Sequence, residues 1–169
     1  MIQVYTGKGK GKTTAALGLA LRAVGHGKSV KMIQFMKGQT EYGEIKTAEQ
    51  LNGFSIEQYG RSTFVNLKSP AQIDIDMAQK GLERAREIIK SNQFDIVILD
   101  EINIAAYYNL VDVQEVISLI KMLPKDKELI LTGRNMPAEI EHYADLISDV
   151  NEIKHYYKTG TDAREGIEY

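Results

Sequence analysis

Residues 7–14 have the sequence Gly-Lys-Gly-Lys-Gly-Lys-Thr-Thr, which combines the residue types that bind phosphate groups. An apolar run (residues 2–5) precedes them and a helix-prone segment (residues 15–24) follows, which is the setting of a phosphate-binding loop, or P-loop. Glycines at every second position allow positive φ and turn backbone N–H groups towards an anion, and the following helix adds its positive dipole end. The predicted phosphate-binding residues are Gly7, Lys8, Gly9, Lys10, Gly11, Lys12, Thr13 and Thr14.

Within this loop, we expect the Lys12 ammonium to contact a phosphate oxygen and the Thr13 hydroxyl to bind a magnesium ion. The usual P-loop pattern leaves four residues between its first glycine and Gly-Lys-Thr, whereas only three separate Gly7 from Gly11. The alternative is a surface turn that binds nothing, but the flanking strand and helix favour phosphate binding. The shortened loop indicates that a bound nucleotide lies differently from the nucleotide of an ordinary ATPase.

A second candidate group is the acidic pair Asp100 and Glu101, which directly follows the apolar run 96–99. Such a run is typical of a buried parallel strand, and in P-loop enzymes an acidic residue at its end holds the metal. We expect Asp100 to hold the metal directly or through water, and Glu101 to face the nucleotide. A strand that ends in solvated acids is the alternative, and the presence of the loop favours function. Lys12 and Glu101 are the predicted catalytic residues.

Three further residues follow predicted strands or lie in a loop. Lys37 and Arg134 come after strands at 29–35 and 128–132, at the sheet edge where ligands bind, so both are candidates for phosphate or substrate contacts. Phe64 lies in an apolar loop over residues 60–68, which either covers part of the core or forms a wall for a large, flat ligand. Periodicity alone makes Arg22 a solvated helix residue.

The alternation of predicted elements indicates how these residues are positioned. Strands at 2–5, 29–35, 54–59, 94–101 and 128–132 alternate with helices at 15–24, 44–51, 70–89, 103–108, 112–123 and 137–143, and residues 146–156 are expected to be extended. Ser69 is the predicted cap of the long third helix and Pro70 its first residue. This pattern predicts one α/β domain over residues 1–169, with a mostly parallel sheet between helices.

Composition limits the possible functions. A net charge of −2 gives no general attraction to nucleic acid or to an anionic membrane, and we expect neither as a partner. The absence of cysteine excludes disulfides and thiolate sites and suits the cytoplasm. No apolar run approaches membrane-spanning length. Residues 158–169 are polar with two glycines, and by composition we expect a disordered tail.

Several stretches taken together resemble the P-loop corrinoid adenosyltransferases. They are the loop with its following residues (7–16) and residues 21–28, 34–38, 99–103 and 131–134, as well as the end of the chain from Ile153 to Tyr169. A generic P-loop protein would not be expected to match at the carboxyl terminus, so the resemblance is more specific than the loop alone.

The resemblance implies a P-loop NTPase-like fold of the RecA type and transfer of the 5′-deoxyadenosyl group of ATP to the Co(I) centre of a corrinoid, cobalamin or a precursor, with release of triphosphate. It implies a Mg²⁺ or Mn²⁺ ion held with the help of Glu101, and a nucleotide or corrinoid surrounded by Arg22, Arg134 and His155. It also implies reversed binding of ATP, an ordered carboxyl-terminal segment that forms part of the site, a cytoplasmic homodimer, and a reductase that supplies Co(I). Adenosylcobalamin biosynthesis or salvage is the corresponding process.

In this family an aromatic residue at the position of Phe64 crowds the lower face of the corrin, which eases reduction of Co(II) to Co(I). The sequence departs from the related enzymes two residues later, where Asn66 replaces tryptophan, and at Lys8, where asparagine is common. Two other classes remain open from the residues alone: a P-loop ATPase or small-molecule kinase in which Glu101 activates water or a hydroxyl, and a nucleotide-dependent switch without appreciable turnover.

Overall fold

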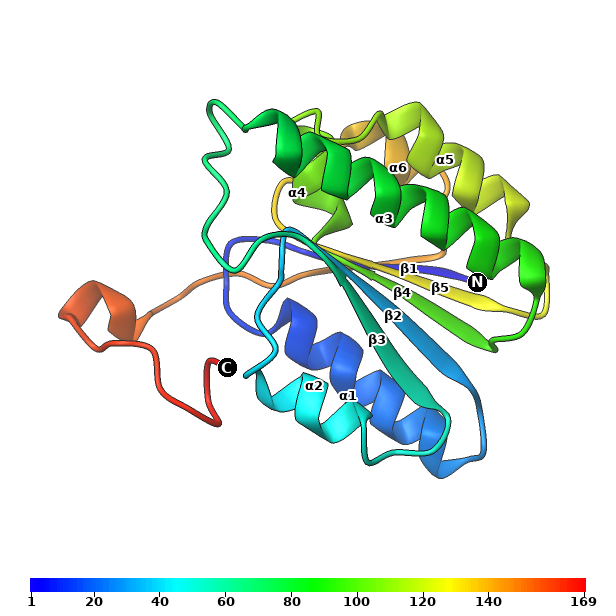
Figure 1. Ribbon diagram of the computed structural model, residues 1–169, viewed down its shortest axis with the longest axis horizontal. Helices are drawn as coiled ribbons and strands as arrows, with labels where there is room; N and C mark the ends of the chain where they lie inside the picture. The colour runs from blue at the N-terminus through cyan, green and yellow to red at the C-terminus, as the bar shows by residue number, and fades with distance from the viewer.

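Six parallel strands form one sheet in the computed structural model of the protein, which describes residues 1–169 (Figure 1). The strand order is β3-β2-β4-β5-β1-β6, and every neighbouring pair is parallel. The strands are β1 (Ile2–Thr6), β2 (Val30–Phe35), β3 (Phe54–Tyr59), β4 (Ile96–Asp100), β5 (Glu128–Thr132) and β6 (Leu146–Asp149). The predicted α/β class with a parallel sheet is confirmed.

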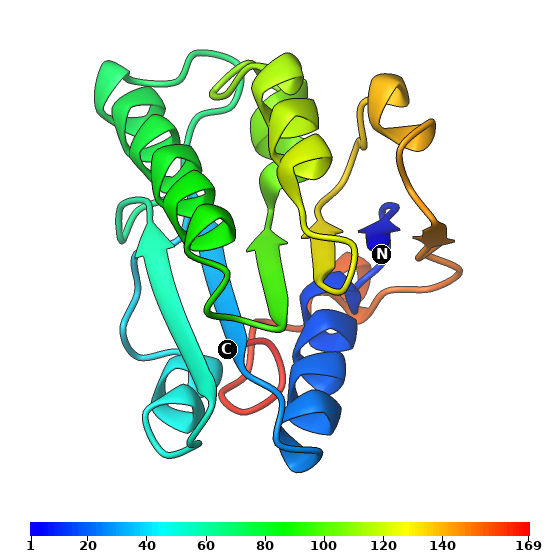
Figure 2. The same cartoon turned by 90° about the vertical axis from the view of Figure 1, so that its right-hand side faces the viewer.

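Helices cover both faces of the sheet, as Figures 1 and 2 show. On one face lie α1 (Lys12–Gly25) and α2 (Gly43–Ala48). On the other lie α3 (Gln72–Ser91), α4 (Ile102–Tyr107), α5 (Val113–Met122) and α6 (Ala138–Glu141), and a 3₁₀ turn, η1 (Tyr156–Thr159), follows the last strand. This arrangement accounts for the apolar run of β4. Val97 and Leu99 pack in the core beneath α3 to α5, whereas Ile96 and Ile98 pack beneath α1, because successive strand residues point to opposite faces.

The sheet topology brings distant loops together. Because all strands are parallel, the segments that follow β1, β2, β4 and β5 emerge at the same edge. These segments carry the P-loop, Lys37, the Asp100–Glu101 pair and Arg134. Ligands bind at this edge in open α/β sheets.

The start of α3 differs from the prediction. The helix begins at Gln72 with Ala71 as its N-cap, and neither Ser69 nor Pro70 is helical. Asp74 supplies the cap instead, since its carboxylate accepts a hydrogen bond of 3.1 Å from the Ala71 N–H. The prediction of a helix start at Ser69 and Pro70 was wrong. A side chain in the first helical turn, Asp74, satisfies the backbone N–H at the helix start, so no serine cap is required.

The carboxyl-terminal segment also differs from the expectation based on composition. It returns across the P-loop rather than extending away from the domain, and the Lys10 ammonium donates a hydrogen bond of 2.8 Å to the carbonyl oxygen of Ile167. The part of residues 146–156 that pairs with the sheet is confined to β6. None of the helices combines the length and the apolar character needed to cross a membrane.

Candidate active site

The P-loop joins the end of β1 to the start of α1, and its three glycines have different roles. Gly7 and Gly11 have positive φ values of 100° and 124°, as expected for this turn. Gly9 does not have a positive φ. Its missing side chain instead permits close backbone packing, because a Cβ atom there would lie 2.8 Å from the Val150 carbonyl oxygen. The Gly9 N–H donates to that same oxygen at 2.7 Å, so this amide is already paired within the protein.

Lys12, the first residue of α1, is held inside the loop. Its side chain is 6% exposed, and its ammonium donates a hydrogen bond of 2.7 Å to the Gly9 carbonyl oxygen. Burial lowers the pKa of this lysine, the carboxylate of Glu101 opposes that shift, and the nearby guanidinium of Arg134 adds to it. An anion bound in the loop would supply the negative counter-charge that the Lys12 ammonium lacks in the ligand-free protein.

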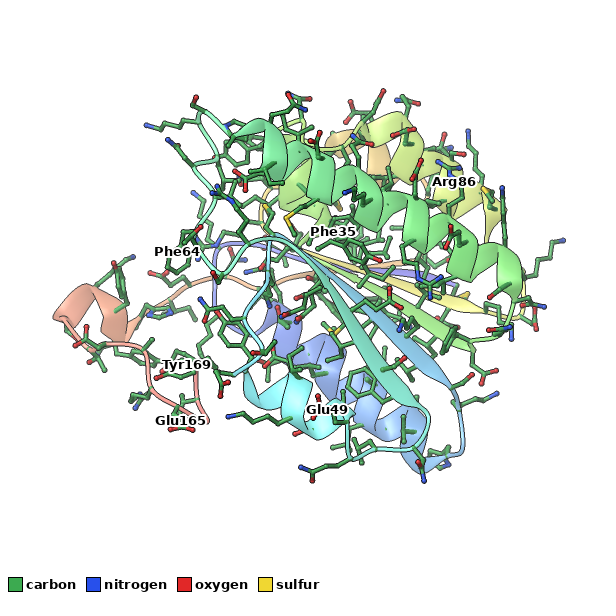
Figure 3. The ribbon with its side chains drawn as sticks, viewed as in Figure 1. Phe35, Glu49, Phe64, Arg86, Glu165 and Tyr169 are labelled. Carbon is green, nitrogen blue, oxygen red and sulfur yellow. The ribbon has the colours of Figure 1, made fainter.

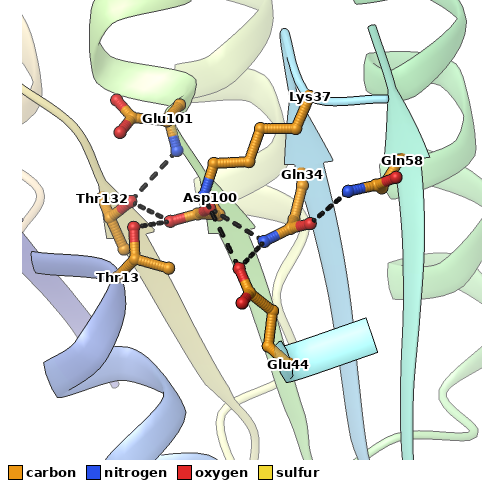
Figure 4. Close-up of polar contacts among 8 residues, drawn as sticks. All are labelled: Thr13, Gln34, Lys37, Glu44, Gln58, Asp100, Glu101 and Thr132. Carbon is orange, nitrogen blue, oxygen red and sulfur yellow. Dashed lines mark hydrogen bonds and ion pairs between the residues drawn. The ribbon is translucent and has the colours of Figure 1, made fainter. Parts of the chain in front are cut away.

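Asp100 is the centre of a buried polar network at the end of β4 (Figure 4). Its Oδ1 atom accepts hydrogen bonds from the hydroxyls of Thr13, at 2.8 Å, and Thr132, at 2.7 Å. Its Oδ2 atom accepts one of 2.8 Å from the Lys37 ammonium and one of 3.3 Å from the Gln34 amide. The carboxylate is therefore fixed by residues from α1, β2, β5 and the loop after β2.

Lys37 lies between acidic groups. Its ammonium pairs with Asp100 and also lies 4.0 Å from the Glu44 carboxylate on α2. Burial alone would lower the pKa of Lys37, but the charge and hydrogen bond of Asp100, together with the charges of Glu101 and Glu44, outweigh this effect and raise the pKa above the ordinary value. Lys37 is therefore charged and paired with Asp100 in the ligand-free protein, and its contact with a phosphate or substrate stays a prediction.

Glu101 has a different environment from its neighbour. Its backbone adopts the left-handed conformation, with φ at 63°, and its N–H donates a hydrogen bond of 3.0 Å to the Thr132 hydroxyl. The carboxylate itself makes no hydrogen bond or ion pair and lines the main cavity. Burial raises the pKa of Glu101, and the charge of Asp100 adds to this shift. A carboxylate that is partly desolvated and unpaired is suited to receive a cation.

These observations fit a divalent metal ion near the P-loop. The Thr13 hydroxyl and the carboxylates of Asp100 and Glu101 are hard oxygen ligands of the kind that Mg²⁺ prefers. No group of three or more histidine, cysteine, aspartate or glutamate side chains could hold a metal by itself. This agrees with the usual form of nucleotide sites, in which a few protein oxygens act together with phosphate oxygens and water.

A cavity of about 730 Å³ opens above this network. Most of the predicted site residues line it: Gly9, Lys10, Gly11, Lys12, Thr13, Thr14, Lys37, Glu101, Arg134 and His155. Arg134 makes no hydrogen bond or ion pair, so its guanidinium is free to contact a ligand. The His155 ring accepts a hydrogen bond of 3.1 Å at Nδ1 from the Tyr157 N–H.

Other predicted residues lie outside this cavity. Gly7 packs against the chain after β6, where a Cβ atom would lie 2.2 Å from the Asp149 carboxylate. Lys8 is exposed. Arg22 is exposed in the last turn of α1, about 15 Å along the helix from Lys12. Asp100 is fully buried beneath the cavity floor.

Phe64 is 96% exposed on the loop before α3, at the edge of the molecule (Figure 3). It lines a smaller hollow of about 180 Å³ that shares Lys37, Tyr42 and Glu101 with the main cavity. Val65 and Leu67 pack against the core, as the first interpretation of this loop expects. Phe64 faces solvent, and its contact with a large, flat ligand stays a prediction. The Arg61 guanidinium pairs with Asp74 through hydrogen bonds of 2.7 and 2.8 Å, which fixes the loop to α3.

Sequence reasoning missed several residues of the site. Gln34 and Thr132 are polar residues at the ends of strands, and both contact Asp100. Their polarity within otherwise apolar strands was the available signal. Residues 166–169, in the terminal segment that the resemblance made part of the site, line the main cavity. Tyr42, in the loop before α2, and Glu44, in α2, line it as well. No local pattern marks these as neighbours of the P-loop.

Comparison with known proteins agrees with this geometry. The family model described as ATP:corrinoid adenosyltransferase BtuR/CobO/CobP matches residues 1–169. A corrinoid adenosyltransferase of Sinorhizobium sp is 37% identical over 100% of this chain and 80% of its own length. Those of Escherichia coli strain K12 and Salmonella typhimurium are 33% and 34% identical, each over 100% of this chain and 85% of their own length. Because the family model and these relatives match the whole chain, it belongs to the ATP:corrinoid adenosyltransferase family.

Proposed function

We propose that the protein transfers the 5′-deoxyadenosyl group of ATP to the Co(I) centre of a corrinoid, cobalamin or a precursor, in adenosylcobalamin biosynthesis or salvage. The observation that carries this proposal is the match of the family model to every residue of the chain. In the reaction, the Co(I) electron pair forms a bond to C5′ of ATP and the C5′–O5′ bond breaks. The electron pair of that bond leaves with triphosphate, and cobalt is oxidised to Co(III).

The arrangement of the site suits this chemistry. Cobalt is the nucleophile, so the protein needs no serine or cysteine nucleophile; its tasks are to place C5′ in line with cobalt and to stabilise the departing negative charge. Lys12 and the amino-terminal end of α1 supply positive charge where triphosphate would lie. Arg134 provides a second, unpaired positive charge at the same cavity.

A divalent ion, Mg²⁺ or Mn²⁺, would be held by Thr13 and Glu101, with Asp100 acting directly or through water. When bound, such an ion neutralises phosphate charge. Asp100 orients the Thr13 hydroxyl, and the unpaired carboxylate of Glu101 is the open ligand position. Gly7 and Lys8 would act on the nucleotide indirectly, through the shape of the loop.

Phe64 is placed to meet the corrinoid. An exposed aromatic ring beside a hollow that adjoins the nucleotide cavity suits a large, flat ligand, and its contact with the lower corrin face would keep the lower axial ligand away from cobalt. Reversed binding of ATP, with its sugar towards that hollow, would bring C5′ to the cobalt centre of the corrinoid. Arg22, outside the cavity, is the least supported of the proposed ligand-binding residues.

We also infer a cytoplasmic homodimer that depends on a separate reductase for Co(I). The family resemblance supports all three features, and the absence of cysteine fits a reducing compartment. Light scattering of the purified protein would give its mass relative to the 19.0 kDa chain. A protein that stays monomeric at working concentration would contradict the dimer.

Product analysis tests the proposed function. The protein is incubated with ATP, Mg²⁺ and chemically reduced cobalamin, and triphosphate and adenosylcobalamin are quantified. Equal amounts of both products, formed only when corrinoid and reductant are present, are the expected result. Release of orthophosphate without corrinoid would identify an ATPase instead, and the absence of any turnover would identify a nucleotide-binding switch.

A further inference from the structure

The carboxyl terminus forms one wall of the nucleotide cavity. Lys10 of the P-loop donates a hydrogen bond of 2.8 Å to the Ile167 carbonyl oxygen, and its ammonium lies 3.6 Å from the Glu168 carboxylate. Figures 1 and 3 show the end of the chain beside the start of α2. Both the P-loop and α2 are far from this end in the sequence. The last residue, Tyr169, is therefore placed at the cavity by contacts to the phosphate-binding loop itself.

Glu168 fixes this terminal segment. Its carboxylate accepts a hydrogen bond from the Tyr156 hydroxyl and one of 2.7 Å from the Arg164 N–H. The Arg164 guanidinium lies over the Tyr156 ring, 4.8 Å from its centroid, and also bonds to Glu168. The Tyr156 hydroxyl, followed by Arg164, holds the pKa of Glu168 at about 2, so this carboxylate is charged at neutral pH.

Tyr169 lies beside a second aromatic residue of the cavity wall, Tyr42. Its ring centroid lies 6.1 Å from that of Tyr42, and the two ring planes are inclined at 38°. Both residues line the cavity that contains the P-loop. Stacked carbon atoms are optimally about 3.5 Å apart, so a flat ring inserted between two others separates their planes by about 7 Å. To enclose one planar heterocycle, the centroids would have to move apart by about 1 Å and the rings would have to turn until their planes are parallel.

The charges around the two tyrosines indicate which part of a nucleotide could lie there. The carboxylates of Glu44 and Glu168 line the cavity together with the two tyrosines, and each is already paired with a lysine: Glu44 lies 4.0 Å from the Lys37 ammonium and Glu168 lies 3.6 Å from the Lys10 ammonium. The positive groups Lys12 and Arg134 belong to the P-loop and to the loop after β5. The tyrosine end therefore offers a triphosphate no unpaired positive charge, whereas a neutral base needs none.

Another apolar surface of the same cavity is the competing site. Leu17 and Leu21 of α1, together with Leu51 and Phe54, also line the cavity. This surface is mainly aliphatic and offers a base the single aromatic ring of Phe54. The tyrosine pair offers two ring faces, and base–aromatic stacking contributes about 1–3 kcal/mol for each base.

We propose that Tyr42 and Tyr169 form the stacking site for the nucleobase of the bound nucleotide, and that the carboxyl-terminal segment is fastened to the P-loop in order to complete this site. The inference rests on the proposed use of ATP. Stacking alone distinguishes bases weakly, because every base has a π-face, so the site would accept purine nucleotides other than ATP.

Equilibrium binding without corrinoid tests this proposal. Calorimetry would measure the affinity of the wild-type protein and of Tyr42→Ala and Tyr169→Ala for Mg²⁺·ATP and for inorganic triphosphate, which has no base. We expect each variant to bind ATP roughly 5- to 100-fold more weakly and to bind triphosphate as the wild type does. Tyr42→Phe and Tyr169→Phe, which retain the rings, should bind ATP normally.

Matched controls make the outcomes distinct. Tyr157→Ala removes an exposed tyrosine of the same segment that does not line the cavity, and Leu21→Ala alters the competing surface. Equal losses for ATP and triphosphate would overturn the proposal, because the tyrosines would then support only the loop. A loss of ATP affinity in Leu21→Ala but in neither tyrosine variant would place the base beside α1. A wild-type protein that binds ATP without adenosylating a corrinoid would instead refute the proposed function and leave this test intact.

Discussion

The hydroxyl of Thr13 donates a hydrogen bond of 2.8 Å to Oδ1 of Asp100, which joins the first turn of α1 to the end of β4. The other carboxylate oxygen of Asp100 accepts a hydrogen bond from Lys37, so one buried charge connects the P-loop to the loop after β2. A nucleotide that moves Thr13 would therefore act on Lys37 as well. The stability of the ligand-free site depends on keeping this charge balanced.

Replacement of Asp100 by asparagine tests that balance. Asp100→Asn keeps the size of the side chain but removes the nearer counter-charge of the Lys37 ammonium and leaves only the Glu44 carboxylate at 4.0 Å, and we expect the free energy of unfolding to fall by about 3 kcal/mol. Adding Lys37→Met should recover part of the loss, because the unpaired charge is then removed. Urea denaturation measures both effects. Asp126→Asn, at an exposed position, is the control. If Asp100→Asn and Asp126→Asn lowered the free energy of unfolding equally, the Lys37–Asp100 pair would have no special role in stability.

Lys12 should be essential for turnover. In Lys12→Ala the departing triphosphate loses a charge-assisted contact, which should raise the activation barrier for adenosylation by about 2–3 kcal/mol. We therefore expect kcat/KM to fall roughly 30- to 150-fold. Initial rates of adenosylcobalamin formation provide the measurement. Lys90→Ala, an exposed lysine in the last turn of α3, should behave as the wild type. Near-normal activity of Lys12→Ala would mean that the loop does not bind triphosphate.

The raised pKa of Glu101 predicts a pH-dependent stability of the ligand-free protein. Below the ordinary pKa of 4.5 this carboxyl is protonated in both the folded and the unfolded chain, and its burial carries no charge penalty. As the pH rises through the raised pKa of the folded state, the folded protein retains a proton that the unfolded chain releases, and stability is lost. Glu101→Gln should therefore be more stable than the wild type by about 1 kcal/mol near neutral pH, with no difference below about pH 4.

Urea denaturation at several pH values would measure this difference. Glu49→Gln, at an exposed position after α2, is the matched control and should show no such dependence. If Glu101→Gln gave the same stability increment at every pH, titration of this carboxyl would not be its cause. Saturating Mg²⁺·ATP should abolish the advantage of the variant, because a bound cation favours the charged carboxylate.

Asp74 should hold the Phe64 loop as well as the start of α3. Its buried carboxylate pairs with both nitrogens of the Arg61 fork and caps the helix at Ala71, so Asp74→Ala should reduce the free energy of unfolding by about 2–4 kcal/mol. Asp76→Ala, on the exposed side of the same helix, should cost less than about 0.5 kcal/mol. Similar free energies of unfolding for Asp74→Ala and Asp76→Ala would show that the Arg61–Asp74 pair does not support the loop.

The absence of tryptophan from the chain allows a direct probe of that loop. Phe64→Trp would introduce a single tryptophan at a 96% exposed position, so its emission should be that of a solvated indole. Adding a corrinoid should quench this emission or shift it to shorter wavelength, if position 64 contacts the corrin. The same change at Tyr107, an exposed residue of α4, serves as the control. An emission spectrum at position 64 that corrinoid leaves unchanged would exclude this contact.

Local patterns in the sequence determined the elements of this protein and the chemistry that each one carries. The glycine–lysine loop between a strand and a helix, and the apolar run that ends in Asp100, both reflect interactions between residues close in the chain. Their physical cause is local, because turn geometry, helix dipoles and alternation of strand residues act over a few positions. The alternation of strands and helices likewise predicted the parallel sheet, which the structure confirms.

Only the tertiary structure decided which of these groups meet. Lys37 pairs with Asp100 because β2 and β4 are neighbours in the sheet, and the Gly9 amide meets Val150 because β6 lies beside β1. Composition predicted a disordered tail for the last residues, yet the contact between Lys10 and Glu168 places Tyr169 at the cavity. Such contacts join residues up to 158 positions apart, as between Lys10 and Glu168, and depend on strand order and on the packing of the whole chain, to which no local spacing corresponds.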